Sequence, residues 1–162
     1  MTELLLRKNV LIVKNFLFNF DKNIQLIELS KTANTAIEAA KSLNKEVGSI
    51  VKSLVFKNNN QEFYLCLVSG DKFVSLKKIS KILGEEIIKA DADDVKKNTG
   101  FSIGGVPPIA HSNNPKKILI DENLERFETV YAAAGHHSVI FGIHFDQLII
   151  LTKGEVNKIT ED

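Results

Sequence analysis

The sequence has 162 residues, of which 44% are hydrophobic and 25% are charged, a composition that predicts one globular domain over residues 1–162. Its formal net charge of +1 argues against a protein that holds DNA or long RNA mainly by neutralising phosphates, but is compatible with binding a short single-stranded RNA end. No apolar run is long enough to span a bilayer and no secretory signal pattern is present, so we expect a cytoplasmic protein without a membrane partner.

The first quarter of the chain predicts a helix, a strand and a second helix. Apolar residues at several helical spacings indicate a helix over 4–20, and partial alternation indicates a strand over 24–29. Residues 32–34 are of the types that start helices, and the run over 35–40 that follows has strong helix composition. The second helix is expected to end near Asn44.

The next segment predicts a β-hairpin followed by a helix. Residues 50–57 and 62–68 have strand composition, and the asparagine-rich turn at 58–60 between them favours an antiparallel pair. Residues 75–83 carry the pattern of an amphipathic helix, and Gly84 is suited to end it.

The second half of the chain predicts further strands between helices. A short helix is expected over 91–97, strands over 117–120, 129–134 and 139–143, and a closing helix over 146–153. Helices and strands are therefore mixed without strict β-α alternation. This predicts an α+β (mixed α/β) fold in which helices surround a curved, mixed β-sheet.

Lys52 is the first candidate for a functional residue. In a strand, alternate side chains share a face, so Lys52 shares its face with the apolar Ile50 and Leu54. A lysine in such a row either extends to water at an edge or opens into a cleft, where a partly desolvated ammonium group needs an anionic or strongly polar partner.

The second candidate is a loop over 99–108 that holds three glycines and two prolines. Glycine permits positive φ and close approach to a ligand, and proline stiffens the chain that follows. Such a loop can direct main-chain N–H and C=O groups at a ligand, although it could equally be a tight connection between two elements. It is not a phosphate-binding P-loop, because the Lys-Ser/Thr pair is missing.

Neither a metal nor a protein nucleophile is indicated. The four histidines, His111, His136, His137 and His144, form no HExxH motif or paired ligand spacing, and no cofactor is expected. The single cysteine, Cys66, lies within a strand pattern and is expected to pack as a small apolar group. If the protein is a hydrolase, water is its expected nucleophile.

Several of these segments resemble the YbaK/ProX (YbaK/EbsC) family of aminoacyl-tRNA editing deacylases. The resemblance covers nearly the whole chain, and the matching pieces occur in the family's order and spacing. The combination of the lysine-bearing strand with a GxxxP element is its most specific part. The pieces lie at residues 35–40, 51–56, 68–71, 90–91, 99–101 and 104–108.

The resemblance implies a trans-acting deacylase that hydrolyses the ester joining a mismatched amino acid to the 3′-terminal ribose of a tRNA. The family is related to the editing insertion of bacterial prolyl-tRNA synthetases. Its fold is a strongly curved mixed sheet wrapped by helices. The implied partner is the CCA end of a mischarged tRNA. The near-neutral charge predicts weak affinity for RNA, which suggests that a synthetase or an elongation factor delivers the substrate.

The resemblance also assigns roles to particular residues. Lys52 matches the family's functional lysine, which lies near the terminal adenosine and the ester. The backbone of Gly104 and Gly105 matches the element that shapes the amino-acid pocket and holds the reacting groups, so these three residues are the expected catalytic residues. The residues expected to bind substrate are Thr35, Ser53, Thr99, Gly100, Phe101, Val106, Pro107, Pro108, Gly135 and His136.

The amino acid removed and the class of activity leave alternatives open. Cysteine-specific members of the family tend to carry an acidic residue in the strand after the late glycine turn, and residues 138–141 contain none here. Alanine, serine, threonine and 2-aminobutyrate are candidates. The alternatives to a tRNA deacylase are a hydrolase of small free esters or amides in the same pocket and a non-catalytic module that binds tRNA or a synthetase.

Overall fold

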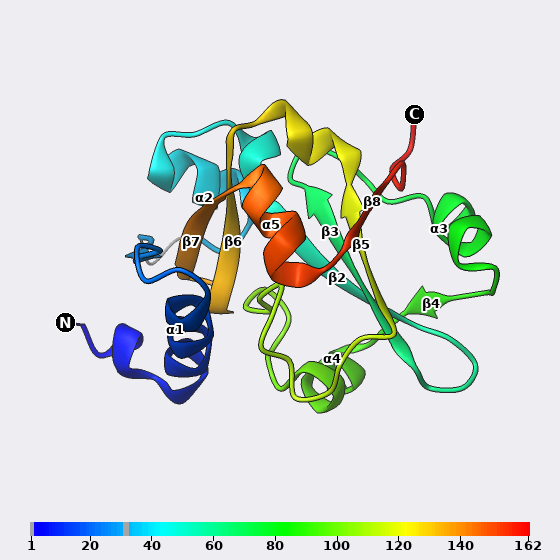
Figure 1. Ribbon diagram of the computed structural model, residues 1–162, viewed down its shortest axis with the longest axis horizontal. Helices are drawn as coiled ribbons and strands as arrows, with labels where there is room; N and C mark the ends of the chain where they lie inside the picture. Colours follow the sequence, from blue (N-terminus) through cyan, green and yellow to red (C-terminus); the bar gives the residue numbers. More distant parts are fainter. Residues whose placement is uncertain (1, 31–32) are drawn as a thin grey trace.

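The computed structural model describes residues 2–30 and 33–162, and over these residues it combines five α-helices with two β-sheets (Figure 1). The predicted α+β fold is confirmed. The predicted curved sheet consists of two separate hydrogen-bonded ladders, which meet at an isolated parallel bridge between Ile50 and Tyr131.

The larger sheet has five strands in the order β4-β2-β3-β5-β8. The predicted hairpin is confirmed: β2 and β3 pair antiparallel, from Val51 opposite Ser69 to Lys57 opposite Phe63. The Asn58 side chain holds the turn between them by accepting from the backbone N–H groups of Asn60 and Glu62. The strands are β2 (Val51–Lys57), β3 (Phe63–Ser69), β4 (Ile88–Lys89), β5 (Lys117–Asp121) and β8 (Glu155–Asn157).

The smaller sheet has the order β1-β7-β6, and all its pairs are antiparallel. Its strands are β1 (Leu26–Glu28), β6 (Thr129–His136) and β7 (Val139–His144). The β6–β7 register shifts between Ala133 and His136, where Gly135 has a φ of +94°. Strand β6 therefore runs further than predicted and includes Gly135 and His136, which leaves His137 and Ser138 as the turn.

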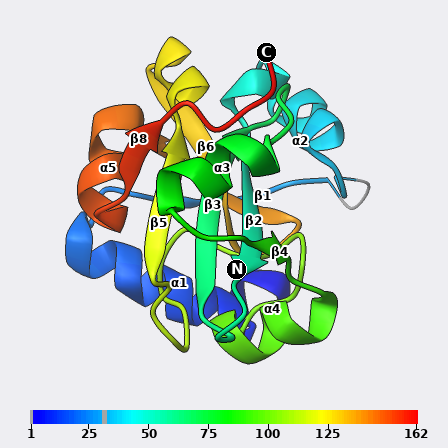
Figure 2. The same cartoon turned by 90° about the vertical axis from the view of Figure 1, so that its right-hand side faces the viewer.

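Five helices surround the sheets, and side chains cap four of them at their N-termini. Thr35, Ser75, Asp91 and His144 are these caps. Helix α1 lies against the smaller sheet, and α3 lies at the other end of the molecule (Figures 1 and 2). The helices are α1 (Lys8–Phe20), α2 (Ala36–Leu43), α3 (Leu76–Leu83), α4 (Ala92–Thr99) and α5 (Phe145–Thr152), with 3₁₀ turns at Leu4–Leu6, Val47–Ser49 and Glu122–Arg126.

The main hydrophobic core lies between the two sheets. Strand β3 is buried on both faces: Phe63, Leu65 and Leu67 join the main core, while Tyr64, Cys66 and Val68 pack with α3 on the other side. This double burial explains why the strand reads as an unbroken apolar run instead of an alternating one. A third, smaller cluster packs α2 against the start of β2 and against β7.

Two expectations about the elements need correction. The helix predicted over 4–20 is broken at Arg7, whose ψ of 143° is extended, so that Leu4 and Leu5 pack on the core separately from α1. The second helix is capped by Thr35 and not by a residue of the predicted start at 32–34. Ala33 and Asn34 precede the cap, and Thr32 lies outside the described residues. The sequence pattern also missed β4 and β8, which have only two and three residues.

Candidate functional site

A cavity of about 260 Å³ opens where β2, the start of α2, the glycine-proline loop and the β6–β7 pair meet; we call it the β2 cavity. Its walls are mainly apolar, and no aspartate or glutamate is among the described residues that line it. Those residues are Ala33, Asn34, Thr35, Ala36, Ala39, Ile50, Val51, Lys52, Ser53, Leu54, Ile103, Gly104, Val106, Tyr131, Ala133, His137 and Ile140.

The floor of the β2 cavity is an open edge of strand β2. On this edge, β4 pairs only with Phe56 and Lys57, and the bridge to β6 is at Ile50. Backbone groups alternate in direction along a strand, and the carbonyl of Val55 points to this edge because it accepts from Ala90. The N–H and C=O of Ser53 therefore point to the same edge, where no strand among the described residues pairs with them.

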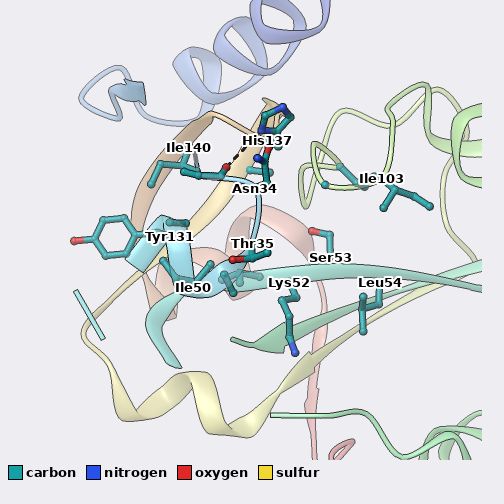
Figure 3. A pocket seen from close by; sticks show the side chains of 17 residues that line it. Asn34, Thr35, Ile50, Lys52, Ser53, Leu54, Ile103, Tyr131, His137 and Ile140 are labelled. Atoms are coloured by element: carbon teal, nitrogen blue, oxygen red, sulfur yellow. Dashed lines mark hydrogen bonds between the residues drawn. The ribbon is translucent and has the colours of Figure 1, made fainter. Parts of the chain in front are cut away.

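Lys52 and Ser53 project from opposite faces of β2 (Figure 3). The Ser53 side chain points toward the side where Thr35 and His137 lie. Its Oγ is buried and has no hydrogen-bond partner among the described residues. A buried hydroxyl without a partner is costly, so Ser53 offers the cavity a donor and acceptor that a ligand could satisfy.

The ammonium group of Lys52 points away from His137 and toward the loop after β3 (Figure 3). Its Nζ donates to the backbone carbonyl of Lys72 at 2.5 Å and lies 5.2 Å from the centre of the Phe73 ring, a residue that is 76% exposed. Burial lowers the pKa of Lys52, and the charges of Asp121 and Asp71 partly oppose this. An ammonium has three donors, so two remain for a ligand.

The carboxylates near Lys52 are already engaged in a network that fixes the loop after β3. Asp71 accepts two hydrogen bonds from Arg126, and this guanidinium holds the pKa of Asp71 below its ordinary value. Arg126 also donates to Ser69 Oγ, and Asp121 accepts from the Ser69 backbone N–H. Lys52 is thus held by a carbonyl in a loop whose acidic groups are bound to other partners.

The 104–108 loop crosses the cavity in close contact with β6. Gly105 donates to the carbonyl of Ser102, and its own carbonyl accepts from Gly135. A Cβ on Gly105 would lie 3.0 Å from the Cα of His136, so only glycine fits without a shift. Gly104 has a φ of +90°, which favours glycine for conformational reasons, and a Cβ there would have room beside His137.

Two histidine rings lie at the β6–β7 turn, and the ring of His137 lines the β2 cavity. His136 and His137 stack with their ring centres 4.3 Å apart. His136 Nδ1 accepts from the Ser138 backbone N–H, and His137 Nδ1 lies 3.1 Å from Ser138 Oγ. Burial lowers the pKa of His136, and the neighbouring His137 and Arg7 add to this effect.

A second cavity, of about 470 Å³, adjoins the first at Ile103 and His137; we call it the α1 cavity. It lies beside the first residues of α1 and the stretch from Gly135 to His137. Its lining consists of Arg7, Lys8, Asn9, Ser102, Ile103, Gly105, Gly135, His136 and His137.

The structure distributes the predicted site residues over three places. Five line the β2 cavity, namely Thr35, Lys52, Ser53, Gly104 and Val106. Gly105, Gly135 and His136 line the α1 cavity. The other five, Thr99, Gly100, Phe101, Pro107 and Pro108, lie outside both linings.

Three of the five residues outside the cavities make contacts that hold the loop. Thr99 Oγ1 donates to the Val95 carbonyl and accepts from the Phe101 backbone N–H, and the Phe101 side chain is buried in the main core. The carbonyl of Pro107 lies 2.7 Å from His111 Nε2. Their predicted part in substrate binding stays a prediction, and the contacts seen here anchor both ends of the 104–108 loop.

Some of the lining was not predicted from the sequence. Asn34, Ile103, Tyr131, Ala133 and Ile140 line the β2 cavity. Ile103 lies inside the loop that was singled out, and its 61% exposure marks it as an apolar side chain at the rim. Tyr131 and Ala133 share one face of β6, so the alternation of this strand is the signal that could have found them together.

Over residues 2–30 and 33–162, no helix is long and apolar enough to cross a membrane. In the same residues, no group of three or more His, Cys, Asp or Glu side chains is arranged to hold a metal ion.

The chain is similar to proteins that act on aminoacyl-tRNA. The model of the family described as the aminoacyl-tRNA editing domain matches residues 30–151. The proposed Cys-tRNA(Pro)/Cys-tRNA(Cys) deacylase EbsC of Enterococcus faecalis is 26% identical, over 78% of this chain and 77% of that protein. Proline–tRNA ligase of Lactobacillus helveticus is 34% identical over 67% of this chain, which corresponds to 20% of the ligase.

A solved structure with the same fold supports the comparison. The crystal structure of a proposed trans-editing enzyme for prolyl tRNA synthetase superposes with a TM-score of 0.91 and 35% identity, over 97% of this chain and 99% of that one.

Proposed function

Because this chain belongs to the aminoacyl-tRNA editing domain family, we propose that it is a free-standing deacylase that hydrolyses the ester of mischarged tRNA. The observation that carries the proposal is the β2 cavity, in which the open edge of β2 at Ser53 faces the backbone of the 104–108 loop. EbsC and the trans-editing structure share the family and the fold, and both support this activity.

Lys52 is proposed to hold the RNA end at the rim of the cavity. Its ammonium lies on the opposite side of β2 from Ser53, so it suits a phosphate or ribose oxygen better than the acyl group. The carbonyl of Lys72 fixes its position and leaves two donors available. Partial burial strengthens its interaction with an anion by excluding water.

Water is the proposed nucleophile in the β2 cavity. Its oxygen forms a bond to the ester carbonyl carbon, the bond to the ribose oxygen breaks, and the leaving oxygen takes up a proton, which yields the free amino acid and a tRNA with a free terminal hydroxyl. We propose that backbone groups of Gly104 and Ser53 orient the ester and the water, while Gly105, whose N–H and C=O are both bonded within the protein, holds the shape of the loop. N–H donors aimed at the developing oxyanion can supply much of the acceleration. The neighbouring ribose hydroxyl assists by positioning the water.

The lining favours an amino acid with a small uncharged side chain. Ile50, Val106 and Ile140 present apolar surface, and no acidic side chain among the described residues lines the cavity. Alanine, serine, threonine and 2-aminobutyrate fit this description. A synthetase cannot strongly reject substrates that differ by one methylene, which is worth about 1–3 kcal/mol, so a second, size-limited cavity adds discrimination.

Delivery of the substrate by a synthetase or an elongation factor is part of the proposal. With a formal net charge of +1, the protein has little general attraction for tRNA. Addition of the cognate synthetase is therefore expected to raise the rate of deacylation at low tRNA concentration.

The test is a deacylation panel over tRNAs charged with alanine, serine, threonine, 2-aminobutyrate and cysteine. We expect release of at least one small amino acid, and loss of this release in the Lys52→Ala variant. Binding of every tRNA without loss of any ester would instead indicate a non-catalytic module. Equal rates on an aminoacylated tRNA and on a simple amino-acid ester would indicate a hydrolase of small esters.

A further inference from the structure

The α1 cavity differs from the β2 cavity in the charges of its lining. Its lining holds two cationic side chains, Arg7 and Lys8, together with His136 and His137, and no aspartate or glutamate among the described residues. Arg7 and Lys8 are exposed, and among the described residues neither forms an ion pair with a carboxylate. A cavity lined by one sign of charge concentrates ligands of the opposite sign.

Several lysines elsewhere in the chain are neutralised by a nearby carboxylate. Lys57 pairs with Asp94 at 2.6 Å, Lys78 with Asp162 at 2.9 Å, and Lys116 lies within 3.4 Å of Glu62 and 3.3 Å of Glu85. Arg7 and Lys8 instead have no carboxylate partner among the described residues, and they line a cavity that lies beside the one proposed for the aminoacyl group.

The floor of the α1 cavity is rigid backbone. A Cβ on Gly135 would lie 2.6 Å from the carbonyl oxygen of Asn9, and a Cβ on Gly105 would meet His136. The polar groups around this floor include the side chains of Ser102 and Asn9. Hydroxyl, amide and cationic donors around a glycine floor form a set that suits phosphate oxygens.

We propose that the α1 cavity binds a phosphodiester of the single-stranded tRNA 3′ end, with Arg7 and Lys8 contacting its oxygens. This inference rests on the proposed function and adds to it a second point of contact with RNA. Ile103 and His137 border both cavities, so a strand that crosses them reaches from the phosphate to the ester. Lys52 holds the RNA on the other side of β2.

The test compares two double variants that remove the same charge. Arg7→Ala with Lys8→Ala removes the cations of the α1 cavity. Lys77→Ala with Lys81→Ala removes two exposed lysines from α3, at the other end of the molecule (Figure 1), and serves as the control. Arg7→Lys with Lys8→Arg retains the charges, and thermal unfolding verifies that each variant is folded.

The first measurement is binding of an uncharged RNA hairpin with an unpaired CCA end, across a range of KCl concentrations. The Arg7/Lys8 alanine variant is expected to bind about tenfold more weakly and to lower the slope of log Kd against log salt by about 1–2, whereas the control stays within about twofold. The charge-retaining variant is expected to recover most of the affinity. This measurement requires no turnover.

The second measurement is deacylation of mischarged tRNA and of aminoacyl-adenosine, which has no phosphodiester. We expect the Arg7/Lys8 alanine variant to raise KM for the tRNA about tenfold with a much smaller change in kcat. Its loss of kcat/KM with aminoacyl-adenosine is expected to be at least fivefold smaller than its loss with the tRNA. Equal losses with both substrates, equal losses in both alanine pairs, or no binding of the hairpin by the unaltered protein would overturn the inference. If the unaltered protein binds the hairpin as expected but hydrolyses no ester, the proposed function fails and the phosphate site stands.

Discussion

The two ends of strand β2 use a lysine in opposite ways. At the end near β4, Lys57 forms a 2.6 Å ion pair with Asp94, and the hydrogen bond that Lys57 donates to this carboxylate raises the pKa of Lys57. At the cavity end, Lys52 has a backbone carbonyl as its partner, and burial lowers its pKa. A cation that is partly desolvated without a carboxylate partner is poised for an anionic ligand, whereas a paired one is structural.

The same contrast applies to the edge of the strand. Near Lys57 the edge is covered by β4, and near Ser53 it is open to the cavity. Unpaired backbone groups and an unpartnered hydroxyl are costly to keep without function. The cavity end of β2 therefore lacks hydrogen-bond partners of the kind that the other end has.

Substitution of the two lysines gives the largest expected difference between the two ends of β2. Lys52→Ala is expected to lower kcat/KM for a mischarged tRNA about 100-fold, the scale of losing one charged or oxyanion contact in an active site. Lys57→Ala should leave kcat/KM within about twofold and slightly lower the thermal midpoint, because it removes only a structural pair. Equal loss of activity in the two variants would show that Lys52 affects activity only by stabilising the fold. A Lys52→Ala variant with full activity would contradict a role of Lys52 in binding the RNA.

Two glycines with positive φ, one at the cavity and one far from it, allow an effect on activity to be separated from an effect on stability. Gly104 at the cavity and Gly84 at the end of α3 have φ values of +90° and +73°, and a Cβ would clash at neither. Alanine should cost each about 1 kcal/mol of stability. The rate of deacylation should fall about tenfold in Gly104→Ala, because its methyl group enters the cavity, and should be unchanged in Gly84→Ala. Chemical denaturation measures the stability of each variant, and kinetics measure its activity.

Two serines test the buried polar groups. Ser53 Oγ has no partner among the described residues, so Ser53→Ala should not lower the free energy of unfolding, because it removes a buried hydroxyl that is costly to keep, while it lowers deacylation about fivefold. Ser69 Oγ donates to the Gly48 carbonyl and accepts from Arg126, so Ser69→Ala should cost about 1–3 kcal/mol. Urea unfolding followed by fluorescence or circular dichroism gives both values, and a large stability loss in Ser53→Ala would mean that its hydroxyl has a structural partner.

The sequence predicts the features whose signals are local. The hairpin follows from alternation around an asparagine turn, and helix α3 from an apolar periodicity with Ser75 before it and Gly84 after it. Strands β4 and β8 were missed because two or three residues carry no period and pair only with distant segments. The division into two ladders depends likewise on which distant strands pair.

The candidate site was likewise predicted only where its signals are local. Composition marked the 104–108 loop, and alternation placed Lys52 on one face of its strand. Neither signal says which face borders a cavity, so the direction of the Lys52 ammonium toward Lys72 emerges only from the packing. Tyr131 and Ile140 reach the cavity because β6 and β7 pair beside it, and no motif in the sequence marks them.

The smallest expected effect concerns Cys66, which lies opposite Leu54 midway along the hairpin. The thiol is fully buried, and burial raises its pKa to about 12, so roughly one molecule in ten thousand carries a thiolate at pH 8. Cys66→Ala should therefore keep deacylation within about twofold, and iodoacetamide should modify Cys66 only after denaturation. Rapid labelling of the folded protein together with loss of activity would instead identify the thiol as a nucleophile, and would move the chemistry from the open edge of β2 into the core behind it.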